Sequence, residues 1–257
     1  DGSFEVVANY DYIQFNTTSK SSDFLTLIET VAQAMANPDL GKEAVAALKT
    51  AQSAKVQEAE KNAAYVADRA VARKLFGTFP YGRPMMGTPA SLQKIDFADL
   101  KFARDRLLTA DNATLVISGS VEPSLALRAV RRYFGAWLKS DKKSPSTFRQ
   151  PDAPDAAIVK VEMPGVSNSE VRYAVRGFAR SSKEFATAEI YSRILQARLA
   201  EAVSKGAGTD AAVTHDEHIL PGAFVFRYRS QASSPAFLSA GASPSLGSLL
   251  DRPVADS

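Results

Sequence analysis

The sequence predicts an α+β protein built from two units. Strand-like and helix-like stretches occur both before and after a polar, proline-rich segment at residues 139–154, which has the composition of a linker. With 257 residues, the chain is long enough for two domains. We therefore expect one unit at residues 1–140, a linker at 141–156 and a second unit at 157–229, followed by a low-complexity or irregular tail at 230–257.

The first unit is expected to begin with strand structure and to continue mainly as helices. Residues 3–17 are rich in β-branched and aromatic side chains with partial alternation, which favours a strand or a bent strand pair with Asn9 near the bend. Apolar residues then recur at helical spacing, interrupted by one continuous apolar run. Helices are expected at residues 21–37, 42–76, 96–108 and 123–137, and a buried strand at residues 112–121.

After the linker the order of elements starts again. Strands are expected at residues 157–163, 170–178, 211–215 and 224–229, and a helix at residues 183–203. Beyond Ser230 the sequence becomes rich in serine, alanine, proline and glycine, which predicts a disordered or reshaped tail.

Composition excludes several classes of protein. The chain has no cysteine, so disulfides, thiolate zinc sites and a thiol nucleophile are excluded. Its net charge is only +3, and the basic and acidic residues are interspersed, which argues against a nucleic-acid surface. No apolar run is long enough to span a membrane, and no secretory signal is visible. The lack of cysteine fits a bacterial exported protein, so a periplasmic or extracytoplasmic location is expected, with the cytoplasm as the alternative.

The most distinctive stretch is a corner at residues 75–95, with the sequence LFGTFPYGRPMMGTPASLQKI. Its three glycines and three prolines end the preceding helical pattern, because proline removes a backbone donor and glycine loosens the backbone. Apolar side chains inside the run predict that it packs against a core. Thr88 or Ser91 is expected to cap a short helix at residues 90–93.

The corner and a second stretch, NATLVISGSVEPSLALRAVRRYFGAW at residues 112–137, together carry a family resemblance. The sequence resembles the pitrilysin/insulinase family of zinc peptidases over roughly residues 1–229, and especially its bacterial branch related to the mitochondrial processing peptidase. In that branch a H-P-Y-G-x-P-x-x-G corner is followed by a helix, a NATLVVVGD strand and a helix ending in YFG. Phe79 stands here where the branch usually has histidine.

The resemblance implies a particular version of the α+β fold. Family members have two repeated units, each an antiparallel sheet with helices packed on one face, an arrangement called a metalloprotease-like α/β roll. By this resemblance the first unit lacks its N-terminal part, namely its opening strands and first helix, and the second unit is truncated. Any H-x-x-E-H segment would then lie upstream of this sequence.

The zinc site of active relatives is expected to be degenerate here. Active members bind zinc through H-x-x-E-H on one helix and through a glutamate on the long helix before the corner. That third-ligand position falls on Lys55, whose ammonium group cannot bind zinc and repels a dication. A shift of one helical turn offers Glu58 instead, but one carboxylate alone cannot hold zinc. We therefore expect no catalytic or metal-binding residue and no cofactor in this chain, although active relatives contain zinc.

The two histidines of the chain occur in the sequence Thr-His-Asp-Glu-His at residues 214–218. A zinc-binding pair needs the two side chains on one helical face, at i and i+4. His215 and His218 are three residues apart in strand-like sequence, where alternation sends them to opposite faces. A solvent-facing hairpin is therefore predicted in place of a metal site.

In two-chain members of the family, the chain without H-x-x-E-H also contributes to catalysis. There the resemblance implies that the partner without H-x-x-E-H supplies an arginine and a tyrosine, which help to bind substrate and stabilise the developing oxyanion. Arg198 and Leu199 match the start of that region, but the functional arginine falls on Ser204 and the tyrosine on Ala211. We expect the substrate-assisting pair to be absent.

Three functions are compatible with this sequence. The first is an inactive, non-catalytic peptidase-like domain, a structural and peptide-holding half of a zinc protease assembly that pairs with another such half or forms a homo-oligomer. The second is an active zinc metalloendopeptidase whose H-x-x-E-H segment lies upstream and in which Glu58 or Glu60 replaces Lys55 as ligand. The third is a pure scaffold without peptide binding.

Overall fold

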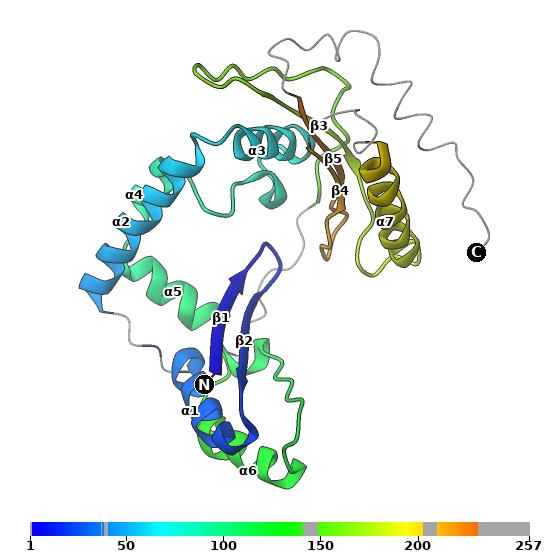
Figure 1. Cartoon of the computed structure of the whole chain (residues 1–257). Coiled ribbons are helices and arrows are strands. Elements are labelled where there is room, and N and C mark those ends of the chain that lie inside the picture. The colour runs from blue at the N-terminus through cyan, green and yellow to red at the C-terminus, as the bar shows by residue number, and fades with distance from the viewer. Residues whose placement is uncertain (1, 37, 39–40, 141–148, 203–209, 231–257) are drawn as a thin grey trace, which may run out of the picture. The chain divides into compact units, whose positions relative to one another are not determined.

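The computed structural model describes residues 2–36, 38, 41–140, 149–202 and 210–230. It confirms the α+β class, because the described chain contains α-helices and two small antiparallel sheets (Figure 1). The chain forms two compact units, Asp1–Val56 with Met86–Phe148, and Gln57–Met85 with Arg149–Ser257. The predicted tail, except Ser230, and the first half of the predicted linker, residues 141–148, lie outside the described residues. The predicted peptidase-like units at 1–140 and 157–229 stay a prediction.

The first compact unit begins with a hairpin of β1 (Gly2–Ala8) and β2 (Ile13–Ser19), which confirms the predicted strand pair. Asn9 shapes the bend, because its side-chain oxygen accepts hydrogen bonds from the backbone N–H groups of Asp11 and Tyr12 at 2.8 and 2.9 Å. The hairpin leads into α1 (Phe24–Ala36), whose Phe24 and Ile28 pack in a small core.

Three further helices of this unit are α4 (Pro89–Lys94), α5 (Phe97–Leu107) and α6 (Pro123–Phe134). α6 begins at a proline without a side-chain cap and supplies Ala129 to the core with α1, whereas α4 and α5 begin at capping side chains. Thr88 and Ser91 form a capping box at α4, and Asp96 and Asp99 form another at α5. The predicted cap at Thr88 is therefore confirmed.

The single long helix predicted at residues 42–76 is wrong, because the chain forms two helices there. α2 (Lys42–Ala59) ends and α3 (Ala63–Phe76) begins around Asn62, which is the N-cap of α3. The Asn62 side chain accepts hydrogen bonds from the N–H groups of Ala64 and Tyr65. An asparagine in this role satisfies the free donors of a new helix and so competes with continuation of the old one.

Two predicted strands are not formed. Residues 112–121 and 157–163 carry strand-like sequence, yet neither has a strand assignment. The first was also expected to be buried, whereas Val116 is 82% exposed. Strand composition is not sufficient, because a strand also needs a neighbour that takes up its backbone hydrogen bonds.

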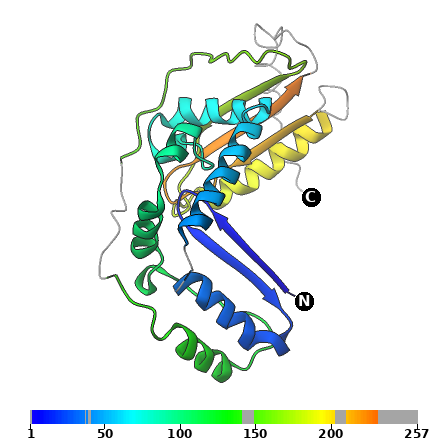
Figure 2. The same cartoon turned by 90° about the vertical axis from the view of Figure 1, so that its left-hand side faces the viewer.

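The second compact unit contains the larger sheet. Its strands are β3 (Ser169–Arg176), β4 (Asp210–His215) and β5 (Ala223–Ser230), in the order β3-β5-β4 with both pairs antiparallel. These strands and α7 (Phe185–Ala202) confirm the strands predicted at residues 170–178, 211–215 and 224–229 and the helix predicted at residues 183–203. In Figure 2 the yellow helix α7 runs alongside the sheet.

Helices contact both faces of this sheet. Arg172 of β3 bonds to Asp68 of α3, whereas His215 of β4 bonds to Glu189 of α7. Because side chains alternate along a strand and the register pairs β3 and β4 with the same residues of β5, these contacts lie on opposite faces. The sheet is therefore a layer between α3 and α7.

The corner after α3 packs as predicted. α3 ends at Gly77, whose φ of 59° lies in the left-handed region, and η2 (Pro80–Gly82) follows as one turn of 3-10 helix. Phe79 and Tyr81 are buried, with their rings edge to face at 5.1 Å between centroids. The corner is therefore a hydrophobic plug. Even a methyl side chain does not fit at Gly82 without displacing the backbone, because an added Cβ would lie 2.5 Å from the Gly77 carbonyl oxygen.

Replacing Gly82 by alanine is expected to destabilise the protein. The new methyl group would displace backbone, which costs about 1–3 kcal/mol in the free energy of unfolding. Urea titration of the wild type and Gly82→Ala measures this loss. Gly41→Ala is the control, because a Cβ there meets nothing within 4 Å. Equal stability of the two variants would contradict the tight fit at the corner.

Candidate functional site

The three residues considered for the third zinc ligand are Lys55, Glu58 and Glu60. Each of the two glutamates forms an ion pair with a basic side chain. Lys55 lies exposed on α2. Glu58 pairs with Lys61 at 2.7 Å on the surface, and Glu60 pairs with Arg69 at 2.8 Å. Within the described ranges, no group of three or more histidine, aspartate and glutamate side chains is arranged to hold a metal.

The substrate-assisting arginine and tyrosine are predicted to be missing at two positions, and the structure describes only one of them. Ser204 lies outside the described residues. Ala211 lies in β4 and faces Tyr228 of β5 across the ladder. The loss of the arginine and tyrosine functions at these positions stays a prediction.

His215 is a core residue, so the predicted solvent-facing position is wrong for this histidine. The hairpin itself is present as β4 and β5, but the His215 side chain is 0% exposed and its ring stacks on Phe224 at 4.4 Å. Strand alternation is the physical reason, since it directs His215 toward α7 together with the buried Val213.

Both ring nitrogens of His215 are engaged. The backbone N–H of Phe178 donates to Nε2 at 3.2 Å, so Nε2 acts as the acceptor. Nδ1 lies 2.6 Å from Glu189 Oε1, and its proton donates to that carboxylate. This arrangement holds the neutral tautomer with its free lone pair already used, so the ring has no position left for a metal.

His218 lies three residues further on and has different neighbours. Its ring stacks on Tyr81 of the corner, with 4.2 Å between centroids, while the Tyr81 hydroxyl accepts a hydrogen bond from the Leu220 N–H at 3.3 Å. The corner and the histidine-containing loop, which are 139 residues apart at the bond between Tyr81 and Leu220, therefore meet in the second compact unit. His218 lies beyond the end of β4, so the strand alternation that predicts opposite faces does not apply to it, although the two rings have different neighbours.

Asp216 lies between the two histidines and is half-buried. Burial raises the pKa of its carboxyl above the ordinary 3.8, and attraction from His218 and Arg227 only partly opposes this. The native state therefore holds this proton more tightly than the unfolded chain does. As a result, Asp216 lowers stability as the pH rises from about 3.8 through the native pKa.

Asp216→Asn is expected to remove this part of the pH dependence. Asparagine carries no charge to bury, so the variant should gain stability relative to the wild type above pH 3.8, and the gain should grow until the native carboxyl is fully ionised. Urea unfolding at intervals between pH 4 and pH 7 measures the difference. A difference that is constant with pH would contradict the raised pKa.

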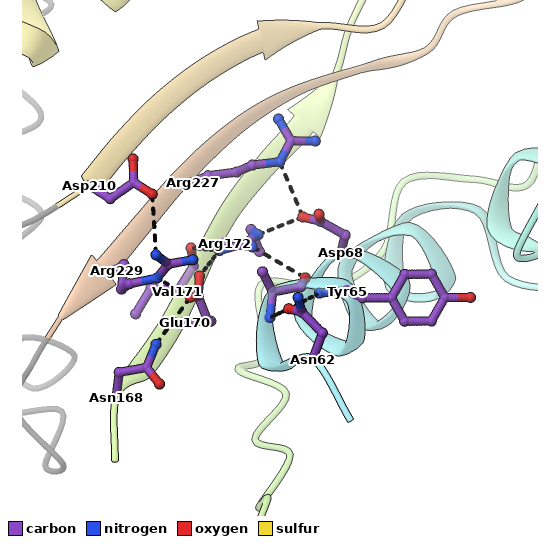
Figure 3. A network of polar contacts seen from close by, with 11 residues as sticks. Asn62, Tyr65, Asp68, Asn168, Glu170, Val171, Arg172, Asp210, Arg227 and Arg229 are labelled. Carbon is purple, nitrogen blue, oxygen red and sulfur yellow. Dashed lines mark hydrogen bonds and ion pairs between the residues drawn. The ribbon is translucent and has the colours of Figure 1, made fainter. Parts of the chain in front are cut away.

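The face of the sheet toward α3 carries a network of ion pairs that was not predicted (Figure 3). Arg172 is its centre: its side chain is 4% exposed and bonds to Asp68 at 2.6 Å and to Glu170 at 3.0 Å. Glu170, 6% exposed, also pairs with Arg229 at 2.6 Å. Arg227 reaches Asp68 at 3.2 Å. Arg229 also lies 3.6 Å from Asp210 of β4, so the network joins α3 to all three strands and pairs three arginines with three carboxylates.

The sequence contains a signal for this network. Glu170 and Arg172 are two residues apart on β3, and Arg227 and Arg229 are two apart on β5, so each pair shares a face. The partner on α3 could not be identified in advance, because nothing in the spacing relates Asp68 to a strand a hundred residues later.

Comparison with known proteins identifies the family. The model of the peptidase M16 inactive domain matches residues 94–238, more than half of the chain. No match was found among curated proteins. Within the described residues, no helix is both long enough and apolar enough to cross a bilayer.

Solved structures share the fold at low sequence identity. The peptidase M16 inactive domain from Pseudomonas fluorescens has a TM-score of 0.84 at 20% identity, covering 97% of this chain and 61% of that one. A protease from Helicobacter pylori has a TM-score of 0.87 at 16% identity, covering 97% and 62%. The periplasmic protease PqqL from Escherichia coli has a TM-score of 0.75 at 15% identity, covering 99% and 29%.

This chain thus spans about three fifths of the length of the first two of these structures. At such identities the likeness establishes the fold alone, and the family rests on the sequence match. That match agrees with the corner and the NATLVISGS stretch, which pointed to the same zinc-peptidase family. The chain belongs to the peptidase M16 inactive-domain family.

Proposed function

We propose that this chain is a non-catalytic, peptide-holding half of a zinc protease assembly. The observation that carries the proposal is membership of the M16 inactive-domain family. Lys55 at the predicted third-ligand position supports it, because an ammonium group opposes a zinc ion. The engaged ring of His215 supports it as well, because it withdraws one of the only two imidazoles from metal binding.

The peptide is held along a sheet edge in this proposal. β4 is the outer strand on one side of the β3-β5-β4 sheet, and an extended peptide adds to such a strand through backbone hydrogen bonds. This mode requires no catalytic side chain, so it is compatible with a degenerate zinc site. The chain supplies no cofactor, and zinc belongs to the catalytic half.

The proposal includes a partner and a location. The catalytic half is a second peptidase-like chain or segment, because this one supplies walls and a binding edge without the reacting centre; a homo-oligomer is the alternative assembly. A periplasmic location is supported by the absence of cysteine and by the periplasmic protease from Escherichia coli among the similar structures. The repeated-unit architecture, with helices on one face of each sheet, stays part of the same proposal and rests on family membership; the larger sheet departs from it, because α3 and α7 contact opposite faces.

Titration with zinc and with peptide tests the proposal. The full chain is dialysed with zinc, and bound metal is counted; a labelled extended peptide is then titrated and its binding isotherm recorded. We expect no stoichiometric zinc and a saturable isotherm. One zinc per chain with chelator-sensitive proteolysis would identify an active metallopeptidase. No saturable binding would identify a scaffold.

A further inference from the structure

The edge of β4 has a defined pattern of backbone groups. The Asp216 N–H donates to the Ala223 carbonyl at 2.8 Å, which continues the β4–β5 register by one residue. In an antiparallel ladder, hydrogen-bonded and non-hydrogen-bonded pairs alternate. Ala211, Val213 and His215 therefore direct their backbone N–H and C=O groups away from β5. These are the groups that an added strand would use.

The central group of this edge is already occupied by a side chain. The Val213 N–H donates to Oε1 of Gln196 on α7 at 2.7 Å. Val213 itself is buried, so its N–H depends on a protein partner for this bond. The Gln196 amide oxygen takes the place in which the carbonyl oxygen of a neighbouring strand would sit.

We propose that Gln196 guards the edge of β4 against an incoming strand. This inference rests on the proposed peptide-holding function and adds a mechanism that regulates it. An extended peptide can accept a hydrogen bond from the Val213 N–H only when the Gln196 side chain rotates away. Unprotected sheet edges pair with other chains, and proteins block them with side chains or coverings. Gln196 acts here as a removable block, because one amide side chain rotates at a far smaller cost than a whole helix moves.

The occupant that fits this edge is a neutral, extended peptide. Backbone donors and acceptors of β4 require a backbone partner, and the strand offers only small side chains, Ala211 and Ala212, before Val213. Charge is concentrated at the start of the strand, where Asp210 lies 3.6 Å from Arg229. Selectivity therefore comes from extended shape and not from a charged anchor.

Variants of Gln196 give opposite expected effects. Gln196→Ala removes the competing acceptor, so a peptide should bind about five-fold more tightly, the equivalent of one ordinary hydrogen bond. Gln196→Met does the same while keeping the length of the side chain, which covers the case that alanine disturbs α7. Gln196→Glu offers a charged acceptor that bonds Val213 more strongly, so binding should weaken. Thr187→Ala, at an exposed polar position on α7, is the matched control and should bind like the wild type.

The probe is a fluorescein-labelled heptapeptide of alternating valine and threonine, titrated against the full chain by fluorescence anisotropy. The same peptide N-methylated at every amide offers no backbone N–H donor from either edge and should not bind. Amide hydrogen exchange of Val213 is followed in parallel, and it should accelerate in Gln196→Ala and Gln196→Met.

The outcomes separate the two proposals. If no variant binds the peptide, the peptide-holding function fails and the guard fails with it. If the wild type binds and both Gln196→Ala and Gln196→Met bind equally well, peptide holding stands and the guard is overturned. Dimerisation of these variants without tighter peptide binding would also overturn the guard.

Discussion

Arg172→Ala is expected to lower the free energy of unfolding by about 3 kcal/mol, because truncating one member of a buried ion pair leaves the other uncompensated. The substitution removes the contacts with Asp68 and Glu170 and also the bond from Arg172 Nη2 to the Ala64 carbonyl. Glu170 keeps Arg229 as a partner, which limits the loss. Urea unfolding followed by far-ultraviolet circular dichroism measures the change.

Arg229→Ala is the matched control for this substitution. Arg229 also pairs with Glu170, but its side chain is 44% exposed, so water screens the pair and Arg229→Ala should destabilise the protein clearly less than Arg172→Ala. Similar losses for Arg172→Ala and Arg229→Ala would show that burial does not decide the strength of this network. A large loss of stability for Arg172→Ala alone would show that the buried contacts of Arg172, which attach α3 to the sheet, contribute most to the stability of this network.

His215→Ala is expected to destabilise the protein by about 3 kcal/mol, through a cavity and through unsatisfied buried groups. The ring packs against Phe224 and Phe185, and its loss leaves the Phe178 N–H without its acceptor. Thermal and urea unfolding provide the measurement.

His218→Ala is expected to destabilise the protein less than His215→Ala does. His218 contributes a stacking contact with Tyr81, which is worth about 1 kcal/mol in pairs of this kind. Zinc is added to the wild type in the same experiment. A zinc-dependent rise in melting temperature that either substitution abolishes would refute the structural role assigned to these histidines.

The elements around the sheet could be predicted because their patterns are local. Alternation predicts β3, β4 and β5, and periodicity predicts α7, without knowledge of any contact. The break at Asn62 was missed because an N-cap asparagine looks like an ordinary surface residue within a helical pattern. Residues 112–121 were assigned as a strand from composition, although strand formation depends on a pairing partner elsewhere.

The candidate site shows the same division between local and distant causes. The spacing of His215 and His218 predicts opposite faces only within one strand, and β4 ends at His215, so the neighbours of His218 depend on the following loop. The burial of His215 depends on α7, and the role of Gln196 depends on the register of β4 against β5, so neither could be derived from the spacing of residues. The predicted ligand position at Lys55 depends on counting along one continuous helix from the corner, whereas the chain forms α2 and α3 there.

The position of β5 in the sheet affects the order in which this unit is assembled. β5 is the last of the three strands to leave the ribosome, yet it is the only one that touches both others. The backbone groups of β3 and β4 therefore stay unpaired and hydrated until residues 223–230 emerge. A ribosome stalled shortly before that point would hold a nascent chain in which no part of this sheet has formed, a form exposed to chaperones and proteases.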